Sequence, residues 1–319
     1  MKMERKVWLL TTVVLLLGIP VIAALPQRGS WMARAPMNEA RQEVAVASLN
    51  GLIYVIGGIR GDRSTADTVE VYNPAADSWH FAAPLPEPLH HTAAVAVNGR
   101  IYVVGGLSGL RFAPRNVTFE YDPLRDVWRS RQPMPRRRGA LAAAVIEGRI
   151  YAAGGSPSFR EQSFAMYDPA EDRWEILPDM PTPRNHLAAA AIGKDFYAIG
   201  GRTTGGSFTL DVVEVFDTET GVWRSAPSLP TGRSGIAAAV VDGVLYVFGG
   251  EGNPRHPLGV FDANEAFFPD AGRWEALAPM PTPRHGIGAA AVGSTIYIPG
   301  GGPVQGFGVT SVNEAFIVE

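Results

Sequence analysis

Eight charged or imidazole side chains are the ones best suited by type to bind a ligand or to move a proton. They are Glu43, Arg60, His91, Arg111, Arg160, His186, Arg202 and Glu251. Carboxylates and imidazoles act as general acids and bases, and the planar guanidinium of arginine suits a carboxylate or a phosphate. Together these residue types predict a site for a polar ligand, and an acidic sugar or an acidic peptide would suit its arginines.

An internal repeat separates these residues from the rest of the chain. The segment Ile53-Tyr54-Val55-Ile56-Gly57-Gly58 is followed by five similar segments, at residues 101–106, 150–155, 196–201, 245–250 and 296–301. The second glycines lie 48, 49, 46, 49 and 51 residues apart. A period near 50 indicates one supersecondary unit used repeatedly. Residues that recur in every unit suit a structural role, whereas residues that differ between units are better functional candidates.

Each unit reads as four antiparallel strands. In the second unit, residues 91–97 and 101–104 flank Asn98-Gly99, a dipeptide that favours a type I′ hairpin. Residues 117–121 form a third strand, and a fourth begins at Val127. The first strand of most units is rich in alanine, as expected where sheets crowd around an axis. The sequence therefore predicts an all-β, six-bladed β-propeller with four strands per blade.

Tryptophans and glycines in the repeat predict structural contacts. Five tryptophans, Trp79, Trp128, Trp174, Trp223 and Trp274, each follow an aromatic of the third strand by seven residues, which suits packing between sheets. Trp31 is the sixth, on a fourth strand with no strands before it, and the last repeat lacks a fourth strand. We expect the N-terminal strand to complete the last blade and close the ring. Gly57 and Gly58 are interpreted as strand terminators rather than as a phosphate loop.

The Gly-Gly pairs, the spaced tryptophans and the Pro-x-Pro-x-x-Arg segments resemble the kelch repeat of the galactose oxidase and kelch superfamily. The resemblance covers residues 31–319 and implies that the loops after Gly-Gly and after Pro-x-Pro share one face, where ligands bind. The arginines of the second segment, Arg41, Arg138, Arg184, Arg233 and Arg284, recur in five units. We interpret them as a framework, together with the recurring Glu70, Glu214, Glu265 and Glu314.

The candidate ligand residues lie where the units differ. We call the place of the recurring arginines in the unit the framework position; Leu89 occupies it in the second unit. Glu43, His91 and His186 stand two places after the framework position, and Arg202 and Glu251 directly follow Gly-Gly. Arg60, Arg111 and Arg160 lie in the loops after Gly-Gly. A channel-lining role for the histidines is favoured over ligand contact, and ligand contact over metal binding, so no metal is predicted. The arginine-rich stretch 111–138 is interpreted as a solvated surface, with binding of an acidic ligand as the alternative.

Several enzyme classes are excluded by missing residues. The chain has no cysteine, so it lacks the crosslinked tyrosine–cysteine of galactose oxidase. The Gly-x-Ser-x-Gly, His-Glu-x-x-His and P-loop patterns do not occur, nor does the Glu-x-x-x-Asp-x-x-x-His iron pattern of kelch specifier proteins. The sequence therefore favours a non-catalytic module that binds a protein or a glycan through the loop face, without a cofactor. The alternative is a cofactor-free carbohydrate-active enzyme, such as the sialic-acid mutarotases that the fold and blade number resemble.

Residues 1–27 differ from the rest of the chain. Lys2, Arg5 and Lys6 precede an apolar run over residues 7–24, which is typical of a signal peptide and is also about the minimum for a membrane anchor. Either interpretation predicts export of the 28–319 propeller to the periplasm, the exterior or the outer side of a membrane. The net charge of −3 gives no reason to expect nucleic acid as a partner. A monomer is expected.

Overall fold

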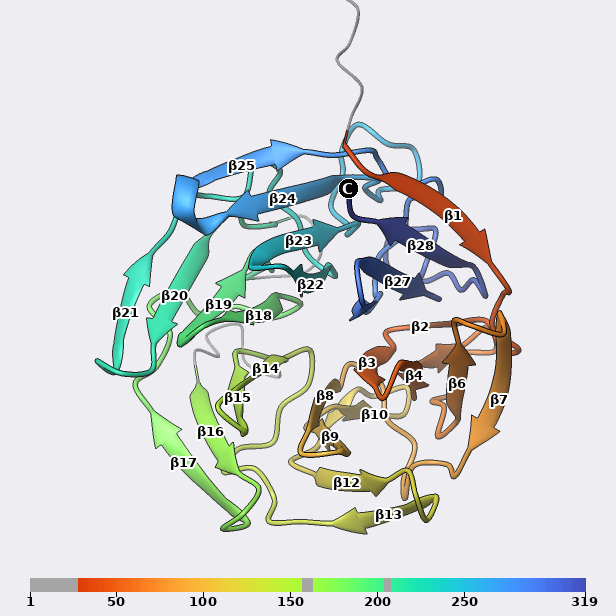
Figure 1. The fold of residues 1–319 in the computed structure, drawn as a ribbon. Helices are drawn as coiled ribbons and strands as arrows, with labels where there is room; N and C mark the ends of the chain where they lie inside the picture. The colour runs from red at the N-terminus through yellow and green to blue at the C-terminus, as the bar shows by residue number, and fades with distance from the viewer. Residues whose placement is uncertain (1–27, 157–162, 204–207) are drawn as a thin grey trace, which may run out of the picture.

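The chain folds as a ring of six four-stranded antiparallel sheets around a central axis (Figure 1). The computed structural model describes residues 28–156, 163–203 and 208–319, so the leader predicted at residues 1–27 lies outside the described part. The only helical element among the described residues is the 3-10 turn η1 (Pro269–Ala271). None of the described residues forms a helix long and apolar enough to cross a membrane. The fold is thus the all-β propeller predicted from the repeat.

The strands of each blade follow one another outward from the axis. The innermost strands are β3 (Ala45–Leu49), β8 (Ala93–Val97), β14 (Ala142–Ile146), β18 (Ala188–Ile192), β22 (Ala237–Val241) and β26 (Ala290–Val292). The second strands are β4 (Leu52–Ile56), β9 (Arg100–Val104), β15 (Arg149–Ala153), β19 (Asp195–Ile199), β23 (Val244–Phe248) and β27 (Thr295–Pro299). The third strands are β6 (Val69–Asn73), β12 (Thr118–Asp122), β16 (Phe164–Asp168), β20 (Val213–Asp217), β24 (Asn264–Phe268) and β28 (Asn313–Ile317). The outermost strands are β7 (Ser78–Ala82), β13 (Val127–Ser130), β17 (Arg173–Leu177), β21 (Val222–Ser225), β25 (Arg273–Ala276) and β1 (Ser30–Arg34).

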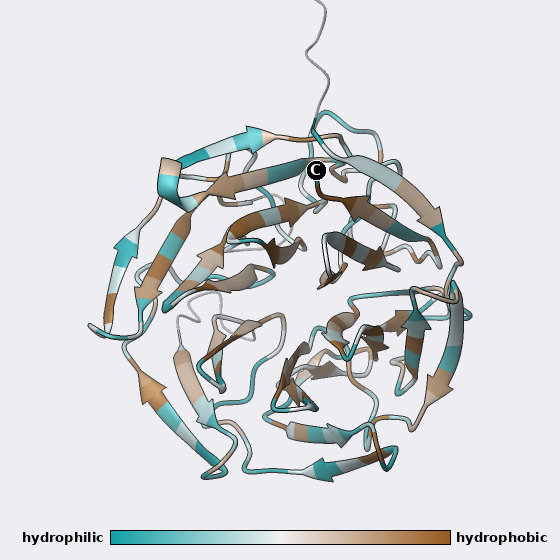
Figure 2. Ribbon diagram, in the orientation of Figure 1, coloured by the Kyte–Doolittle hydropathy of each residue, from teal (hydrophilic) through white to brown (hydrophobic). Residues whose placement is uncertain are grey.

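Side-chain size decides where each strand of a blade sits. The innermost strands carry mostly alanine and valine and line a central channel of about 540 Å³. Larger apolar residues occupy the second and third strands, where neighbouring sheets diverge and leave more room between them. Figure 2 shows this distribution, with hydrophobic colour on the inner strands and hydrophilic colour on parts of the outermost strands and loops. Tight hairpins join the first two strands, and at Asn98-Gly99 both φ angles are positive, 52° and 72°.

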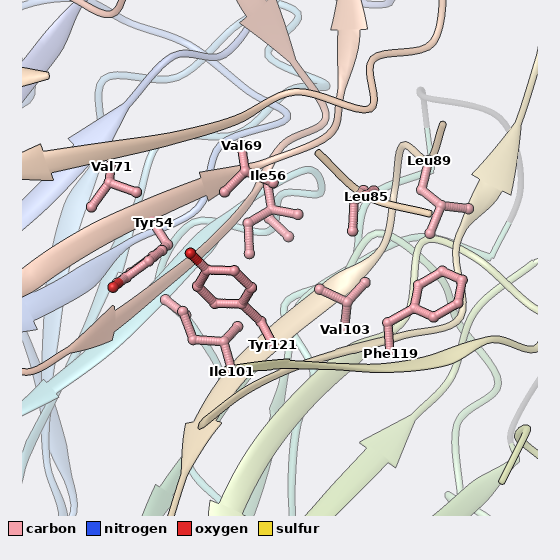
Figure 3. Packing of buried hydrophobic residues seen from close by; sticks show 12 residues of the cluster. Tyr54, Ile56, Val69, Val71, Leu85, Leu89, Ile101, Val103, Phe119 and Tyr121 are labelled. Atoms are coloured by element: carbon pink, nitrogen blue, oxygen red, sulfur yellow. The ribbon is translucent and has the colours of Figure 1, made fainter. Parts of the chain in front are cut away.

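The core lies between adjacent blades rather than within one sheet. Between the first two blades, Tyr54 and Val71 of β4 and β6 pack in one cluster with Ile101 and Tyr121 of β9 and β12 (Figure 3). Tyr54 and Tyr121 meet edge to face with their ring centroids 6.0 Å apart. Interfaces of this kind join each blade to the next, and their apolar burial is the main favourable term for the fold.

Six tryptophans of the repeat, one in each blade, connect neighbouring blades. Each indole N–H donates to a backbone carbonyl of the preceding blade's outer segment, at 2.8–3.0 Å. The donor and acceptor pairs are Trp31–Ala278, Trp79–Ala35, Trp128–Ala83, Trp174–Gln132, Trp223–Pro178 and Trp274–Pro227. Each ring therefore contributes both packing and a directed hydrogen bond across an interface.

The Gly-Gly pairs end the second strands where backbones approach closely. Gly57 has φ +61°, and a Cβ atom added there would lie 2.2 Å from the carbonyl oxygen of Leu89. The N–H of Gly58 donates to the same carbonyl at 2.8 Å. Equivalent bonds link the other blades, including one from Gly301 to Arg41 across the closure. The glycines are needed for this contact, since any side chain would block it.

The ring is closed by the N-terminal strand. β1 pairs with β28 in register from Ser30–Ile317 to Arg34–Asn313, and the last sheet has the order β1-β28-β27-β26. The indole of Trp31 packs against Phe316 and Phe248, with ring centroids 5.2 and 5.9 Å away. The last blade therefore combines the two ends of the described chain.

Candidate functional site

Buried arginines hold the loops above the channel. Four of them form buried ion pairs with glutamates of the third strands: Arg41–Glu70, Arg184–Glu214, Arg233–Glu265 and Arg284–Glu314. Arg138, also buried, donates to the carbonyls of Gly154 and Ser163. In the second blade the buried Leu89 takes the arginine's place, and Glu120 pairs with Arg131 and accepts from Tyr102. These residues fix the loops but do not form the site.

The residue after each framework position pairs with the residue after Gly-Gly. The short strands β2 (Arg41–Gln42) and β5 (Ile59–Arg60) make this contact in the first blade. Isolated bridges make it in the others: His90–Leu107, Gly139–Ser156, Asn185–Arg202, Ser234–Glu251 and His285–Gly302. In the second blade, β10 (Leu107–Ser108) also pairs with β11 (Ala113–Pro114). Both sets of loops are thereby held side by side on one face.

A circle of backbone hydrogen bonds surrounds the axis beneath these loops. It runs through the second residue after each framework position, and all six have positive φ: Glu43, His91, Ala140, His186, Gly235 and Gly286. Each N–H donates to the carbonyl of the preceding member of the circle at 2.7–3.1 Å, and the circle closes where Glu43 N–H donates to the carbonyl of Gly286. The side chains of this circle therefore converge on the axis, at the floor of the loop face.

A pocket of about 720 Å³ lies above this circle. Glu43, His91 and His186 form its floor with Arg202 and Glu251, and Phe112 and Phe307 contribute aromatic surface from the loops. The guanidinium of Arg63 lies over the Phe307 ring, 4.7 Å from the centroid. Arg63 forms no ion pair within the described part of the chain, so its charge is available at the pocket wall.

The floor is a network of ionisable groups. His91 Nε2 lies 3.3 Å from Glu43 Oε2, and His285 Nδ1 lies 3.6 Å from Glu43 Oε1 and 3.5 Å from Glu251 Oε2. Arg202 forms an ion pair with Glu251 and has Nη2 2.8 Å from His186 Nε2. The rings of His91 and His186 are 4.9 Å apart, although they come from blades two apart. Convergence on the axis brings together residues that are far apart in sequence.

Burial shifts the pKa values of these groups. Desolvation lowers the pKa of His90 and of His91 to about 3 and lowers that of His186 well below its usual value. Desolvation also raises the pKa of Glu43. Burial pushes the pKa of Glu251 upward as well, but the positive charges of His285 in its protonated form and of Arg202 outweigh it and leave the pKa lowered. The two carboxylates thus differ because only Glu251 has a guanidinium directly on it.

Hydrogen bonds to acceptors fix the tautomers of two histidines. His285 Nε2 lies 2.9 Å from the carbonyl oxygen of Val304, which only accepts, so Nε2 carries the proton. His285 Nδ1 is buried and has no hydrogen-bond partner. His186 Nδ1 lies 2.6 Å from Asn185 Oδ1, so this nitrogen carries the proton and Nε2 offers a lone pair.

The same reasoning applies to the pair of adjacent histidines. His90 Nε2 lies 3.4 Å from the carbonyl oxygen of Gly109 and donates toward it. His90 Nδ1 therefore accepts from His91 Nδ1, at 2.5 Å. The remaining nitrogen of His91, Nε2, presents its lone pair to Glu43.

Comparison with known proteins places this architecture in a family. A model of the kelch motif matches residues 40–86, 88–135 and 137–181. A model described as the KLHDC2/KLHL20/DRC7 Kelch-repeats domain matches residues 177–302. The chain belongs to the kelch-repeat β-propellers. No curated protein sequence matches this kelch propeller significantly.

Among solved structures, the one titled "Structure of YjhT" is similar to this kelch propeller with a TM-score of 0.74 and 16% sequence identity. The match covers 87% of this chain and 95% of that chain. Identity at this level shows a shared fold and transfers no site residue.

Five of the eight predicted ligand residues meet in the pocket of the kelch propeller: Glu43, His91, His186, Arg202 and Glu251. Arg60 does not line it and instead pairs with Glu39 and Asp67. Arg111 is exposed outside the pocket lining, and Arg160 lies outside the described residues. Of the eight arginines in the stretch 111–138, three form ion pairs with described residues, since Arg115, Arg125 and Arg131 contact Glu87, Asp122 and Glu120.

Sequence reasoning missed His90, His285 and Gln42 in the site. All three stand one place after the framework position, where the six units carry Gln42, His90, Gly139, Asn185, Ser234 and His285. This position is polar in five units and varies in type, so the same search for departures from the repeat would have found it. The aromatic wall gave no such signal, because Phe112 and Phe307 lie in loops that differ in length and have no aligned counterparts.

Proposed function

We propose that this kelch propeller is a glycan-binding module that holds one or two sugar units in its axial pocket, without catalysis. The observation that carries the proposal is a pocket of about 720 Å³ with aromatic surface on its wall and fixed polar groups on its floor. Sugars present apolar C–H faces and hydroxyl edges, so they use both kinds of surface. The volume lies within the range of roughly 300–1,000 Å³ that small-molecule sites occupy.

The shape of the site favours a small ligand over a protein surface. A stable protein interface buries roughly 800 Å² per partner, usually over a broad surface. Here the polar groups converge instead at the bottom of a depression, on a floor fixed by the hydrogen-bonded circle. Of the two ligand classes that the sequence left open, the glycan therefore fits better.

Arg63 favours a sugar that carries an acidic group. Its guanidinium is held over Phe307 and has no carboxylate partner among the described residues. Arg202, by contrast, is engaged by Glu251. A ligand carboxylate would therefore be drawn to Arg63 at the wall while the sugar hydroxyls reach the floor.

A glycan array with the purified protein, followed by calorimetry on its hits, tests this proposal. We expect Phe307→Ala to weaken binding by about tenfold or more, since stacking of this kind contributes on the order of 1 kcal/mol or more. Phe81→Ala removes an exposed phenylalanine from the outer strand β7 and is the matched control. Equal losses in the two variants, or an array without hits, would contradict a glycan site at this pocket.

The catalytic alternative is separated by a second measurement. We expect N-acetylneuraminate anomers to equilibrate no faster with the protein than in buffer, followed by NMR. Acceleration that Glu43→Gln abolishes would instead establish the cofactor-free mutarotase and overturn the non-catalytic part of the proposal.

Export by residues 1–27 belongs to the same proposal and is supported by their basic start and apolar run. The propeller begins beside Ser294 and Asp242, in the hairpin turns that face away from the pocket. A tethered propeller would thus present its pocket away from the tether. Cell fractionation that finds the full chain only in the cytosol would contradict export.

A further inference from the structure

The floor of the pocket holds more acceptors than donors. His91 Nε2 and His186 Nε2 present lone pairs by the tautomers that their outer hydrogen bonds impose, and a neutral His285 presents a third at Nδ1, toward Glu43 and Glu251. Among the described residues, Arg202 is the one arginine or lysine in contact with this group. Arg202 contacts His186 Nε2 and forms an ion pair with Glu251, but it has no such contact with Glu43, His91 or His285.

The most pronounced mismatch is at His285. The residue is 1% exposed, and its Nδ1 has no hydrogen-bond partner. Its neighbours are carboxylate oxygens of Glu43 and Glu251 at 3.6 and 3.5 Å, which also lack protons when ionised. A buried acceptor aimed at two other acceptors is unfavourable unless a cation or a proton lies between them.

The spacing of these atoms suits a metal ion. One ligand atom from each of Glu43, His91 and His186 lies within 4.8 Å of the other two. The 3.3 Å between His91 Nε2 and Glu43 Oε2 is the edge expected of a tetrahedron. Bonds of about 2.0–2.1 Å to such ligands give an edge of roughly 3.3 Å.

The outer hydrogen bonds also match those of metal-binding histidines. A histidine ligand typically donates its second ring N–H to a carbonyl or another acceptor, which fixes the ring and its tautomer. His186 does so to Asn185 and His285 to Val304. His91 does so to His90. Each of the three rings is therefore oriented by a partner outside the cluster.

We infer that Glu43, His91 and His186 form a binding site for a divalent first-row transition metal ion, with His285 as a further ligand. With neutral imidazoles, two carboxylates and one guanidinium leave one buried negative charge, which the ion would compensate. Imidazole with carboxylate favours zinc, manganese, iron or cobalt over magnesium and calcium, which prefer oxygen ligands. Binding requires Arg202 to release His186 Nε2, and Glu251 and Ser234 remain as its partners.

The metal site goes beyond the proposed glycan binding and does not depend on it. Metal content is measured without any sugar, and the glycan array can be run in the presence of a chelator. Failure of one proposal therefore leaves the other standing. The competing way to balance the cluster is a proton on His285 Nδ1 or on Glu43 in place of the ion, so the experiment must separate the ion from the proton.

Metal titration of the purified protein tests the inference. After treatment with a chelator and dialysis, the protein is incubated with Zn²⁺, Mn²⁺ or Co²⁺, and bound metal is measured by mass spectrometry. We expect about one ion per chain and a rise in thermal stability on binding. Bound Co²⁺ should also give the visible absorption of a site with nitrogen ligands. Mg²⁺ at the same concentration should produce neither effect.

Variants then locate the ion. We expect His91→Ala and His285→Ala to weaken Zn²⁺ binding by about tenfold or more while the near-ultraviolet circular dichroism is retained. His80→Ala is the matched control, because His80 is exposed on β7 and lies outside the pocket. Glu43→Gln keeps the shape of the side chain and covers the case in which an alanine variant fails to fold. Less than about one tenth of an ion per chain, or equal binding by the His80 and His91 variants, would overturn the site in favour of the proton.

Discussion

At the scale of single residues, the framework arginines show how strongly one buried charge depends on its partner. Arg233 is fully buried, pairs with Glu265 and donates to the carbonyls of Gly249 and Val247. We expect Arg233→Leu to lower the free energy of unfolding by roughly 3–5 kcal/mol, since it leaves a buried carboxylate unpaired. Urea titration measures the change.

Two further variants make this prediction specific. Arg233→Leu combined with Glu265→Leu should cost less than Arg233→Leu alone, because no charge is then left without a partner. Arg173→Leu breaks only the exposed ion pair with Glu171 and should cost less than about 1 kcal/mol. A double variant as unstable as the single one would show that the carbonyl contacts, not the ion pair, carry the effect.

The framework and the site differ in how far the sequence could reveal them. Arg233 and Glu265 recur in most units, and recurrence alone indicated a structural role. Glu43, His91 and His186 stand out as departures at one position of the unit. Their mutual contact could not be read from the sequence, because it depends on where six equivalent loops meet the axis. Arg60 and Arg111 were selected by residue type and by their place in the loops after Gly-Gly, and neither side chain lines the pocket.

At the scale of the element, the residues that lead into the fourth strand of a blade occur in two forms. The position two residues before each tryptophan has positive φ in every blade: Gly29, Asp77, Asp126, Asp172, Gly221 and Gly272. In three blades an aspartate there accepts from the tyrosine of the third strand and from a backbone N–H of the preceding blade. Tyr121 and Ala83 donate to Asp126 in this way, at 2.6 and 2.7 Å. In the other three blades a phenylalanine accompanies a glycine.

The form with an aspartate before the fourth strand makes the propeller sensitive to acid. Hydrogen bonds from tyrosine and from backbone N–H groups lower the pKa values of Asp77, Asp126 and Asp172. A carboxyl with a lowered folded-state pKa stabilises the fold above its unfolded value of about 3.9 and loses that contribution as the pH falls through the folded value. We expect the melting temperature, measured by calorimetry, to drop as the pH falls below the unfolded-state pKa of about 3.9.

Replacing the aspartate form by the glycine form in one blade tests the cause of the acid sensitivity. Tyr121→Phe combined with Asp126→Gly gives the second blade the residues that the last three blades use. The variant should lose less stability on acidification than the unaltered protein, since one titrating contact is gone. An unchanged acid dependence would mean that other carboxylates, such as those of the framework pairs, dominate it.

At the scale of the whole molecule, the strand pattern and the blade count were predictable from the repeat, because each unit carries the same turn and packing signals. The closure was also predictable, because the repeats begin with a fourth strand that has no other strands before it and end with a unit that lacks its fourth strand. The circle of six backbone hydrogen bonds was not, since it arises only when all blades are assembled. It couples every blade to its neighbours at the axis, as the tryptophans do at the rim.

This coupling predicts that the loss of one strand affects every blade. Deletion of residues 28–37 removes β1 and exposes the edge of β28, and it also removes the hydrogen bond from Trp31 to Ala278. We expect one cooperative transition at a lower urea midpoint, rather than a separate unfolding of the last blade. Hydrogen exchange should then increase in the central strands of all six blades.

A point variant separates closure from ordinary loss of packing. Trp223→Ala removes the equivalent ring from β21 but leaves its sheet and the ring of blades complete. It should lower the unfolding midpoint with exchange increased mainly at its own interface. If the deletion leaves the midpoint unchanged, or if its faster exchange is confined to β26, β27 and β28, then β1 only covers one sheet. Exchange that spreads to β14 and β18, across the axis from the closure, would show that this strand holds the six blades as one unit.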